Sequence, residues 1–358
     1  MSSTEDTSAA ERERTVSTAP RRHRGLLERI GAVAAQAGRG EAGSGRRGTI
    51  ARAVVVVLVI GSMVGFVVSQ WDRLPDFEWR FEPGWLALAV PCVAAFYLLH
   101  AECWRAIVHG LGEPLAGREG RAAWGESILA RYVPTNVLMV VVRILLAERL
   151  GVARRVTVAS MFYELGIAVS AATIVGAYFV ITMPILQDLP IRYGVLLVVP
   201  AVLIGLHPRV FHPLADAVLR RFGREPLPAT LSFARVTLLL AVYVVSWVAV
   251  GTGVFAFASA LHPVAPDDYP FVAAAQAVAF GVAVVTLISP SGLGPRDAAL
   301  AAALAVVLPL TVATAIAIAF RLFQTAVELC FVGVVAAMAR RSRRPVAPRR
   351  TEFYSPGA

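Results

Sequence analysis

A series of long apolar stretches constrains the fold of this chain more than any other feature. The stretches alternate with short polar loops, which is the pattern that a hydrocarbon core about 30 Å thick imposes on helices rising about 1.5 Å per residue. Hydrophobic residues make up 57% of the chain and charged residues only 16%, a balance outside the range of soluble domains. Because the stretches are continuous rather than alternating, they favour helices over a β-barrel. We therefore predict an all-α integral membrane protein.

The basic charge comes from arginine alone, since the chain contains no lysine, and the net charge is +10. Much of it lies in two tails, 1–48 and 340–358. The N-terminal tail mixes arginine with glutamate and has no interleaved aromatic residues, so we expect a disordered cytoplasmic tail beside anionic lipid and no nucleic-acid partner. Its long polar lead does not fit a cleaved signal peptide.

Six apolar stretches are predicted to be full transmembrane helices. They are 51–69, 84–108, 156–183, 191–206, 231–261 and 311–338. Since basic loops remain on the cytoplasmic side, the arginines place both termini in the cytoplasm and the loops at Asp76, Asp188 and Asp267 outside. We expect a multi-pass protein of the bacterial plasma (inner) membrane. The stretch 210–222 gathers apolar residues on one face and predicts a helix in the cytoplasmic interface.

Two further apolar segments are interrupted. The first comprises 124–132 and 137–146, each too short to cross a bilayer alone, and the second comprises 271–289 and 298–308. The residues at the interruptions are turn formers and helix caps. They are Pro134, Thr135, Asn136, Pro290, Ser291, Gly292, Gly294 and Pro295. We predict two broken re-entrant hairpins whose tips meet near the midplane; ordinary kinked spans are the alternative.

The order of these elements repeats in reverse orientation. Residues 84–183 are predicted as span, hairpin opening to the cytoplasm, and span, whereas residues 231–338 are predicted as span, hairpin opening to the exterior, and span. Inverted repeats with discontinuous helices are the usual build of alternating-access carriers, whose site lies near the midplane between the halves. We therefore predict one polytopic membrane domain over 49–339 that contains an inverted repeat.

Short motifs lie in and around the two interruptions. They are Tyr132-Val133-Pro134, Arg143, Gly151-Val152, Glu164, the run from Pro290 to Asp297, and Arg321. Together they resemble the lysylphosphatidylglycerol synthase transmembrane-region family, which includes the flippase-like part of the bacterial multiple peptide resistance factor, over residues 80–340. The chain departs from that family in having Thr135 and Ser291 where glycine is usual, and Asp297 where glutamate is usual.

The resemblance implies a flippase-like protein that handles or translocates an anionic lipid or a polyprenyl-linked glycolipid of the cell envelope. The aminoacyl-transferase domain of such synthases is a separate soluble domain, and only a short tail follows Met338. We therefore expect no aminoacyl transfer, no enzymatic activity and no cofactor. The alternative is a non-transporting partner or scaffold for an envelope glycosyltransferase or lipid-modifying enzyme.

Ionisable residues inside the apolar segments are the candidate substrate-binding residues, because charges within a membrane are costly and usually paired or functional. They are Arg143, Glu164, Arg296, Asp297 and Arg321. Glu164 and Arg321 hold nearly equivalent places in the two proposed repeats. We expect them to lie at similar depth and to interact directly or through the substrate.

Two of these candidates, Arg143 and Asp297, have a structural alternative. Arg143 lies nearer the cytoplasmic end of its segment and can snorkel to lipid headgroups. Pro295 can open a helix whose free amides suit a lipid phosphate, with Arg296 beside it. Asp297 can instead serve only to compensate the dipole of that helix.

Other polar residues in the spans are expected to pair with one another. Glu102 and Arg105 lie three residues apart on one face, and Glu328 lies seven residues after Arg321 as either its partner or part of a polar track. The sequence shows neither metal-ligand spacing nor a nucleophile and base, so we predict no metal and no catalytic residues. The three cysteines fall in apolar segments and are interpreted as packing residues.

Overall fold

The structure is a computed structural model that describes residues 81–132, 136–183, 187–221, 223, 225–285 and 295–342. The first predicted span, 51–69, and both tails apart from 340–342 lie outside the described residues. The same holds for Pro134, Thr135, Pro290, Ser291, Gly292 and Gly294 at the predicted interruptions, so the depth of the hairpin tips stays a prediction. Asn136 and Pro295 are the first residues of two helices.

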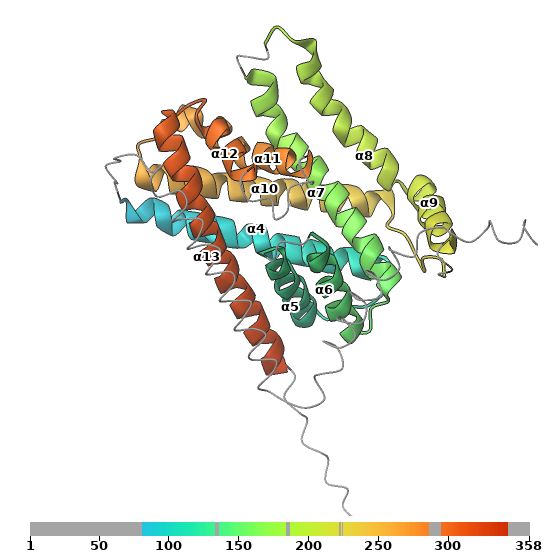
Figure 1. Cartoon of the computed structure of the whole chain (residues 1–358). Coiled ribbons are helices and arrows are strands. Elements are labelled where there is room, and N and C mark those ends of the chain that lie inside the picture. The colour runs from blue at the N-terminus through green and yellow to red at the C-terminus, as the bar shows by residue number, and fades with distance from the viewer. Residues whose placement is uncertain are drawn as a thin grey trace, which may run out of the picture. The chain divides into compact units, whose positions relative to one another are not determined.

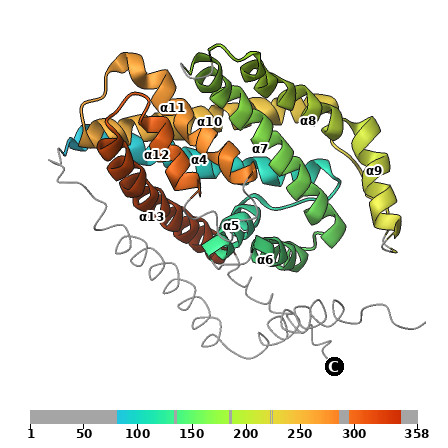
Figure 2. The ribbon, with the colours of Figure 1, turned by 45° about the horizontal axis from the view of Figure 1, so that its top comes forward.

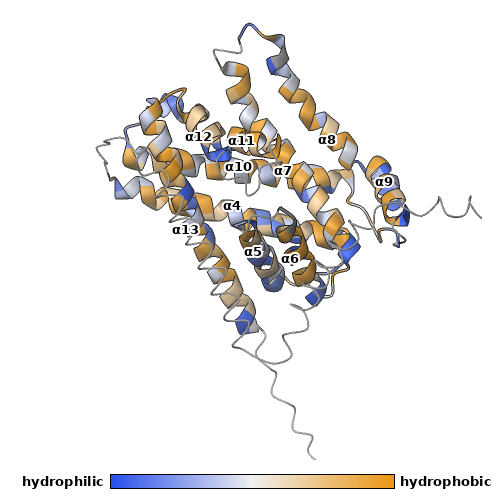
Figure 3. Cartoon of the chain, in the orientation of Figure 1, coloured by the Kyte–Doolittle hydropathy of each residue, from blue (hydrophilic) through white to orange (hydrophobic). Residues whose placement is uncertain are grey.

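All regular structure in the described residues is helical (Figure 1). The elements are α4 (Pro83–Gly110), α5 (Gly117–Ile128), η3 (Leu129–Tyr132), α6 (Asn136–Arg149), α7 (Arg154–Thr182), η5 (Pro190–Leu197), α8 (Val198–Leu206), α9 (Pro208–Arg221), α10 (Phe233–Leu261), η6 (Pro266–Asp268), α11 (Tyr269–Val285), α12 (Pro295–Leu304) and α13 (Leu310–Ser342). Within these residues five helices are long and apolar enough to cross a membrane, or six if α8 and α9 count as one bent span. In Figure 3 these helices are mainly hydrophobic, with polar interruptions along α13. The prediction of an all-α integral membrane protein is confirmed.

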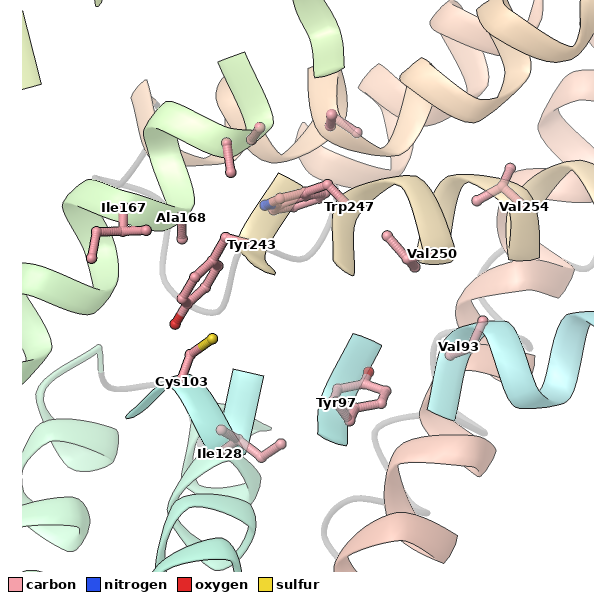
Figure 4. Packing of buried hydrophobic residues seen from close by; sticks show 14 of the residues in the cluster. Val93, Tyr97, Cys103, Ile128, Ile167, Ala168, Tyr243, Trp247, Val250 and Val254 are labelled. Atoms are coloured by element: carbon pink, nitrogen blue, oxygen red, sulfur yellow. The ribbon is translucent and has the colours of Figure 1, made fainter. Parts of the chain in front are cut away.

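Helices α4 and α10 run antiparallel at the centre of the described fold. The amide of Glu82, just before α4, donates to the carbonyl of Ala260 near the end of α10 over 2.9 Å. At the other end, Gly110 of α4 lies against Leu231, just before α10. Between these points apolar side chains from both helices interlock, with Val93 on α4 and Val250 and Val254 on α10 (Figure 4).

The two interrupted segments both fold into pairs of packed short helices. Helix α5, continued by η3, lies against α6, and α11 lies against α12 (Figures 1 and 2). Helix α6 ends in a turn in which Gly151 has a φ of +86° and the amide of Val152 donates to the carbonyl of Ala147 over 3.0 Å. A left-handed φ favours glycine, which gives the Gly151-Val152 motif a structural role. Helix α11 together with η6 is also long enough to be a span of its own.

The hairpins pack reciprocally on the two halves of the chain. Helix α5 of the first half packs against α13, the last helix of the second half, and α11 of the second half packs against α7, the last helix of the first. The predicted inverted repeat stays a prediction.

The predicted amphipathic segment forms α9, which follows α8 after a bend of 63°. Its apolar residues divide between two environments. Phe211 packs on Tyr163 of α7 with ring centroids 4.3 Å apart, whereas Leu214 and Val218 are exposed. Asp216 accepts from the amide of Leu227 over 3.1 Å and holds the following connection in place.

Candidate functional site

A buried group of five side chains fastens the first hairpin to α7. We call it the anchor cluster, and its members are Trp104, Trp124, Ser127, Arg143 and Glu164. Arg143 of α6 forms an ion pair with Glu164 of α7, and its Nε donates to Ser127 Oγ on α5 over 2.9 Å. The indole of Trp124 on α5 donates to the other Glu164 oxygen over 2.7 Å. Both α5 and α6 are thereby joined to Glu164.

The Arg143 guanidinium is enclosed by protein. Its side chain is 2% exposed, and its guanidinium carbon lies 5.5 Å from the ring centroid of Trp104 and 5.7 Å from that of Trp124. Stacking of this kind, together with an ion pair, compensates a buried charge. The snorkelling alternative is therefore wrong for Arg143. Its guanidinium, a candidate for binding substrate, is instead in contact with Glu164, Ser127 and two indole rings of the protein.

The expected direct contact between Glu164 and Arg321 is also wrong, whereas their similar depth and an interaction through a substrate stay predictions. Glu164 points to the first hairpin, and Arg321 forms no ion pair with any of the described residues. Equivalent positions in a repeat fix the depth of two residues but not their direction, since one residue along a helix turns a side chain by about 100°. The expected pair of Glu102 and Arg105 is confirmed at 2.9 Å, and Arg121 joins it.

A second buried group is built on one face of α13. Its residues follow the spacing i, i+3, i+4 and i+7, which places them in one row along a helix. They are Arg321, Gln324, Thr325 and Glu328. The side chains that contact this row are Tyr97, Arg131, Tyr132, Gln276 and Arg296. With Asp297, the buried neighbour of Arg296 on α12, they form what we call the central polar cluster.

Glu328 binds groups from two other elements. Its side chain is fully buried and accepts from the hydroxyl of Tyr97 on α4 over 2.8 Å. It also forms an ion pair with Arg131 of η3 and accepts from the hydroxyl of Tyr132 over 3.3 Å. The partner of Glu328 is thus Arg131, and Arg321 belongs with Glu328 to a polar track rather than to an ion pair.

The second hairpin contributes the opposite wall of this cluster. Arg296, at the start of α12, donates to Gln324 Oε1 over 3.3 Å, and Gln276 of α11 donates to the same oxygen over 3.4 Å. Gln324, which Arg296 contacts, lies one turn from Arg321 and one turn from Glu328, the partner of Arg131, so the three arginines border the same row of α13. Helix α12 begins at Pro295 as predicted, and Asp297 is buried in its first turn.

Four buried polar atoms of the central polar cluster have no hydrogen-bond partner in the described structure. They are Arg131 Nε, Gln276 Oε1, Asp297 Oδ2 and Glu328 Oε1. Unpaired polar groups in a low-dielectric interior carry a large free-energy cost. Among the described atoms of the anchor cluster, no buried polar atom is without a hydrogen-bond partner. The central polar cluster is therefore the better candidate for binding a ligand.

Sequence reasoning missed part of this site. Arg296, Asp297 and Arg321 were predicted and belong to it, but Tyr97, Arg131, Gln276 and Gln324 were not among the candidates. The row on α13 was detectable from its helical spacing alone. Arg131 was not, because its partner Glu328 lies 197 residues away in the sequence.

An apolar groove of about 360 Å³ lies between α7, η5 and α11. Small residues make room for it, and Thr173 is the only polar side chain among the described residues that line it. Gly176 of α7 and Phe280 and Gly281 of α11 are among its lining residues. A Cβ built on Gly281 would meet no atom within 4 Å, so this glycine faces open space. The volume lies in the range of small-molecule pockets.

Five or six membrane-crossing helices, with charged side chains enclosed between them, define a multi-pass α-helical membrane protein. Within that class the chain belongs to the family described as the lysylphosphatidylglycerol synthase TM region, which matches residues 50–331. The family resemblance predicted from the motifs is confirmed. This family is the flippase-like, non-catalytic membrane part of the synthases. No curated protein and no solved structure matched the chain.

Proposed function

We propose that this protein is a flippase-like carrier that binds the headgroup of an anionic lipid at the central polar cluster and moves it across the bacterial plasma membrane. The observation that carries the proposal is the grouping of Arg131, Arg296 and Arg321 within the membrane-crossing region. Arginines inside a membrane are costly unless they serve a partner or a substrate. Guanidinium groups also match the geometry of a lipid phosphate.

The depth of the cluster suits transport. Tyr97, which contacts Glu328, is near the middle of α4, and Glu328 is near the middle of α13. A headgroup at this height is midway between the two leaflets. The cluster is also bounded by η3 of the first hairpin and α12 of the second, which in the proposed inverted repeat open to opposite sides. Cytoplasmic termini remain part of this proposal.

The apolar groove supplies a place for an acyl chain. Its lining is almost wholly hydrocarbon, and it lies beside α11, the helix whose Gln276 reaches the central polar cluster. A lipid needs both a polar and an apolar site if its headgroup is to leave the interface while its chains stay out of water. The scaffold alternative needs neither.

Replacing Arg321 by glutamine should slow lipid movement by about tenfold or more, because one charge-assisted contact to the phosphate is lost. The fold should survive, since Arg321 forms no ion pair with the described residues. The measurement is the rate at which a fluorescent phosphatidylglycerol moves between the two leaflets of proteoliposomes. External dithionite quenches only the lipid in the outer leaflet and so reports this movement. Arg340→Gln, an exposed position near the end of the same helix, is the matched control. Unchanged movement in Arg321→Gln would favour the scaffold alternative.

Replacing Gly281 by leucine should fill the groove without disturbing its walls, because no atom lies within 4 Å of the added Cβ. We expect slower movement of two-chain lipids with an unchanged thermal unfolding temperature in detergent. Gly333→Leu is the control, since Gly333 on α13 is equally open and does not line the groove. Equal rates in wild type and Gly281→Leu would show that no chain uses the groove.

A further inference from the structure

A buried histidine lies at the contact between α4 and α10. His100 of α4 is 7% exposed and is the only buried histidine in the described part of the chain. Its imidazole packs on Phe96 of the same helix, with ring centroids 4.0 Å apart, and on Tyr243 of α10, with centroids 4.5 Å apart. The rings of Trp124 on α5 and Trp247 on α10 follow at 6.2 and 6.4 Å. Aromatic side chains from three helices therefore enclose this ring.

One hydrogen bond determines which ring nitrogen of His100 can take up a proton. Nδ1 lies 2.9 Å from the carbonyl oxygen of Phe96, and because a carbonyl only accepts, Nδ1 must carry a hydrogen. In the neutral ring the lone pair is then on Nε2, which makes Nε2 the base. No described residue donates a hydrogen bond to Nε2. A proton can therefore bind there without displacing a protein donor.

Two of the rings around His100 carry a polar atom that has no hydrogen-bond partner in the described structure. They are the hydroxyl of Tyr243 and the indole Nε1 of Trp247, on residues that are 0% and 2% exposed. Figure 4 shows Tyr243 reaching from α10 toward Cys103, one turn after His100 on α4. Unpaired polar atoms in the interior are costly. A second arrangement of α4 and α10 that lets water reach these atoms would recover part of that cost.

We propose that His100 is the site at which this carrier binds a proton, and that the bound proton favours movement of the two halves of the chain at the contact of α4 and α10. The inference rests on the proposed lipid-moving function and adds the ion that controls it. Ionisable residues inside a membrane are costly and form proton relays in pumps and transporters. The step is the transfer of one proton from water to the lone pair of Nε2, without any change of oxidation state.

The described conformation offers no free carboxylate to a protonated His100. The ionisable groups around the ring are Cys103 on α4, Arg143 on α6, Glu164 on α7 and Tyr243 on α10, while Glu328 of α13 binds Tyr97, one turn before His100. Glu164 is already paired with Arg143 and accepts from Trp124. The Trp124 indole borders both the Arg143 guanidinium and the His100 ring. A protonated His100 would thus be a second cation beside one occupied carboxylate.

This charge distribution determines the direction of the effect. Contacts with aromatic faces offset part of the cost of a buried cation, whereas the neighbouring guanidinium adds to it. The protonated ring is therefore more stable in a conformation in which α4 and α10 separate near His100 and water reaches Nε2. Proton binding shifts the population toward that conformation. Since the two helices belong to different halves of the chain, lipid movement should become faster as the pH falls.

The first measurement is proton binding itself, in the full chain in a neutral detergent. Isotope-labelled histidine reports ring protonation by NMR, and the signal that His100→Gln removes belongs to His100. We expect this ring to be neutral at about pH 8, with its hydrogen on Nδ1, and to take up a proton as the pH is lowered to about 5. A signal that is the same at both pH values would overturn the proposal.

The second measurement is the movement of fluorescent phosphatidylglycerol at two pH values, with the same pH on both sides of the proteoliposomes. The phosphodiester keeps one charge in both conditions, and each sample is returned to the higher pH before dithionite is added. We expect wild type to move the lipid about tenfold or more faster at about pH 5.5 than at about pH 7.5, because one linked proton shifts a population by up to about tenfold per pH unit. His100→Gln should move it equally fast at both.

His109→Gln is the matched control, since His109 lies on the same helix and is exposed. It should keep the pH dependence of wild type. His100→Phe retains a ring at this position without a base, and it replaces His100→Gln in the assay if that protein does not fold. A pH dependence that persists in the His100 variant would overturn the assignment of the proton to this residue.

The two measurements separate this inference from the proposed function. If wild type moves lipid at equal rates at both pH values, the proposed function stands and proton control is overturned. If no lipid moves at either pH, the proposed function fails, and proton uptake by His100 in detergent would then support the proton site alone.

Discussion

Arg143→Gln is expected to lower the free energy of unfolding by about 3–5 kcal/mol, the usual cost of breaking a buried ion pair on one side only. Glu164 would keep its charge between the first hairpin and α7 with no cation to balance it, and Ser127 Oγ would lose its donor. Glu164→Gln should cost a similar amount, because Arg143 is 2% exposed and has no other carboxylate partner in the described structure.

The double variant distinguishes a pair from two independent residues. If Arg143 and Glu164 compensate each other, the double glutamine variant should be much less destabilised than the sum of the two single losses. The measurement is unfolding of the four proteins in detergent, followed by heat or denaturant. The exposed pair of Arg154 and Glu148 is the control and should show a coupling below about 1 kcal/mol. Strictly additive losses at Arg143 and Glu164 would contradict the pairing.

The second large effect is expected from Gly251→Val on α10. A Cβ at this position would lie 2.3 Å from the carbonyl oxygen of Ala273 on α11, and a backbone atom cannot move aside as a flexible side chain can. The helices must therefore separate. We expect the free energy of unfolding to fall by about 3 kcal/mol, the upper end of the range typical of overpacking. Because α11 also carries Gln276, lipid movement should fall together with stability.

Thermal unfolding and the dithionite assay on the same preparation would check this effect. Gly333→Val is the matched control, since the added side chain meets no atom within 4 Å. A Gly251→Val protein that unfolds at the wild-type temperature would show that α10 and α11 do not pack as closely as described. Small residues at such crossings are how membrane helices approach one another in the absence of a hydrophobic driving force.

The extent of the fold was largely predictable from the sequence, because hydrocarbon thickness and backbone hydrogen bonding determine the length and type of each span. The predicted span 231–261 corresponds to α10 at Phe233–Leu261, and the predicted span 84–108 corresponds to α4 at Pro83–Gly110. The helix start at Pro295 followed from the fixed φ of proline at the first helical position.

The site was only partly predictable, because partners depend on the rotation of packed helices rather than on depth. Glu164 was singled out from the sequence as a charge within a span, but its partner is Arg143 on the hairpin and not Arg321. Arg131 precedes the first interruption by three residues, and nothing in its neighbourhood indicates that it reaches Glu328 on the last helix. Such contacts arise only once α5 is laid against α13.

The first hairpin is held by two ion pairs that belong to different halves of the chain. Arg143 joins it to α7 in its own half, whereas Arg131 joins it to α13 in the other. If the halves move as rigid units, the first hairpin must move together with α7. The ion pair between Arg131 and Glu328 must then break. The phosphate of a bound lipid would offer Arg131 a replacement anion. The lipid would in this way lower the free-energy barrier to the movement of the two halves. Under the proposed function, the phosphate of the lipid would thus replace Glu328 as the partner of Arg131 during movement.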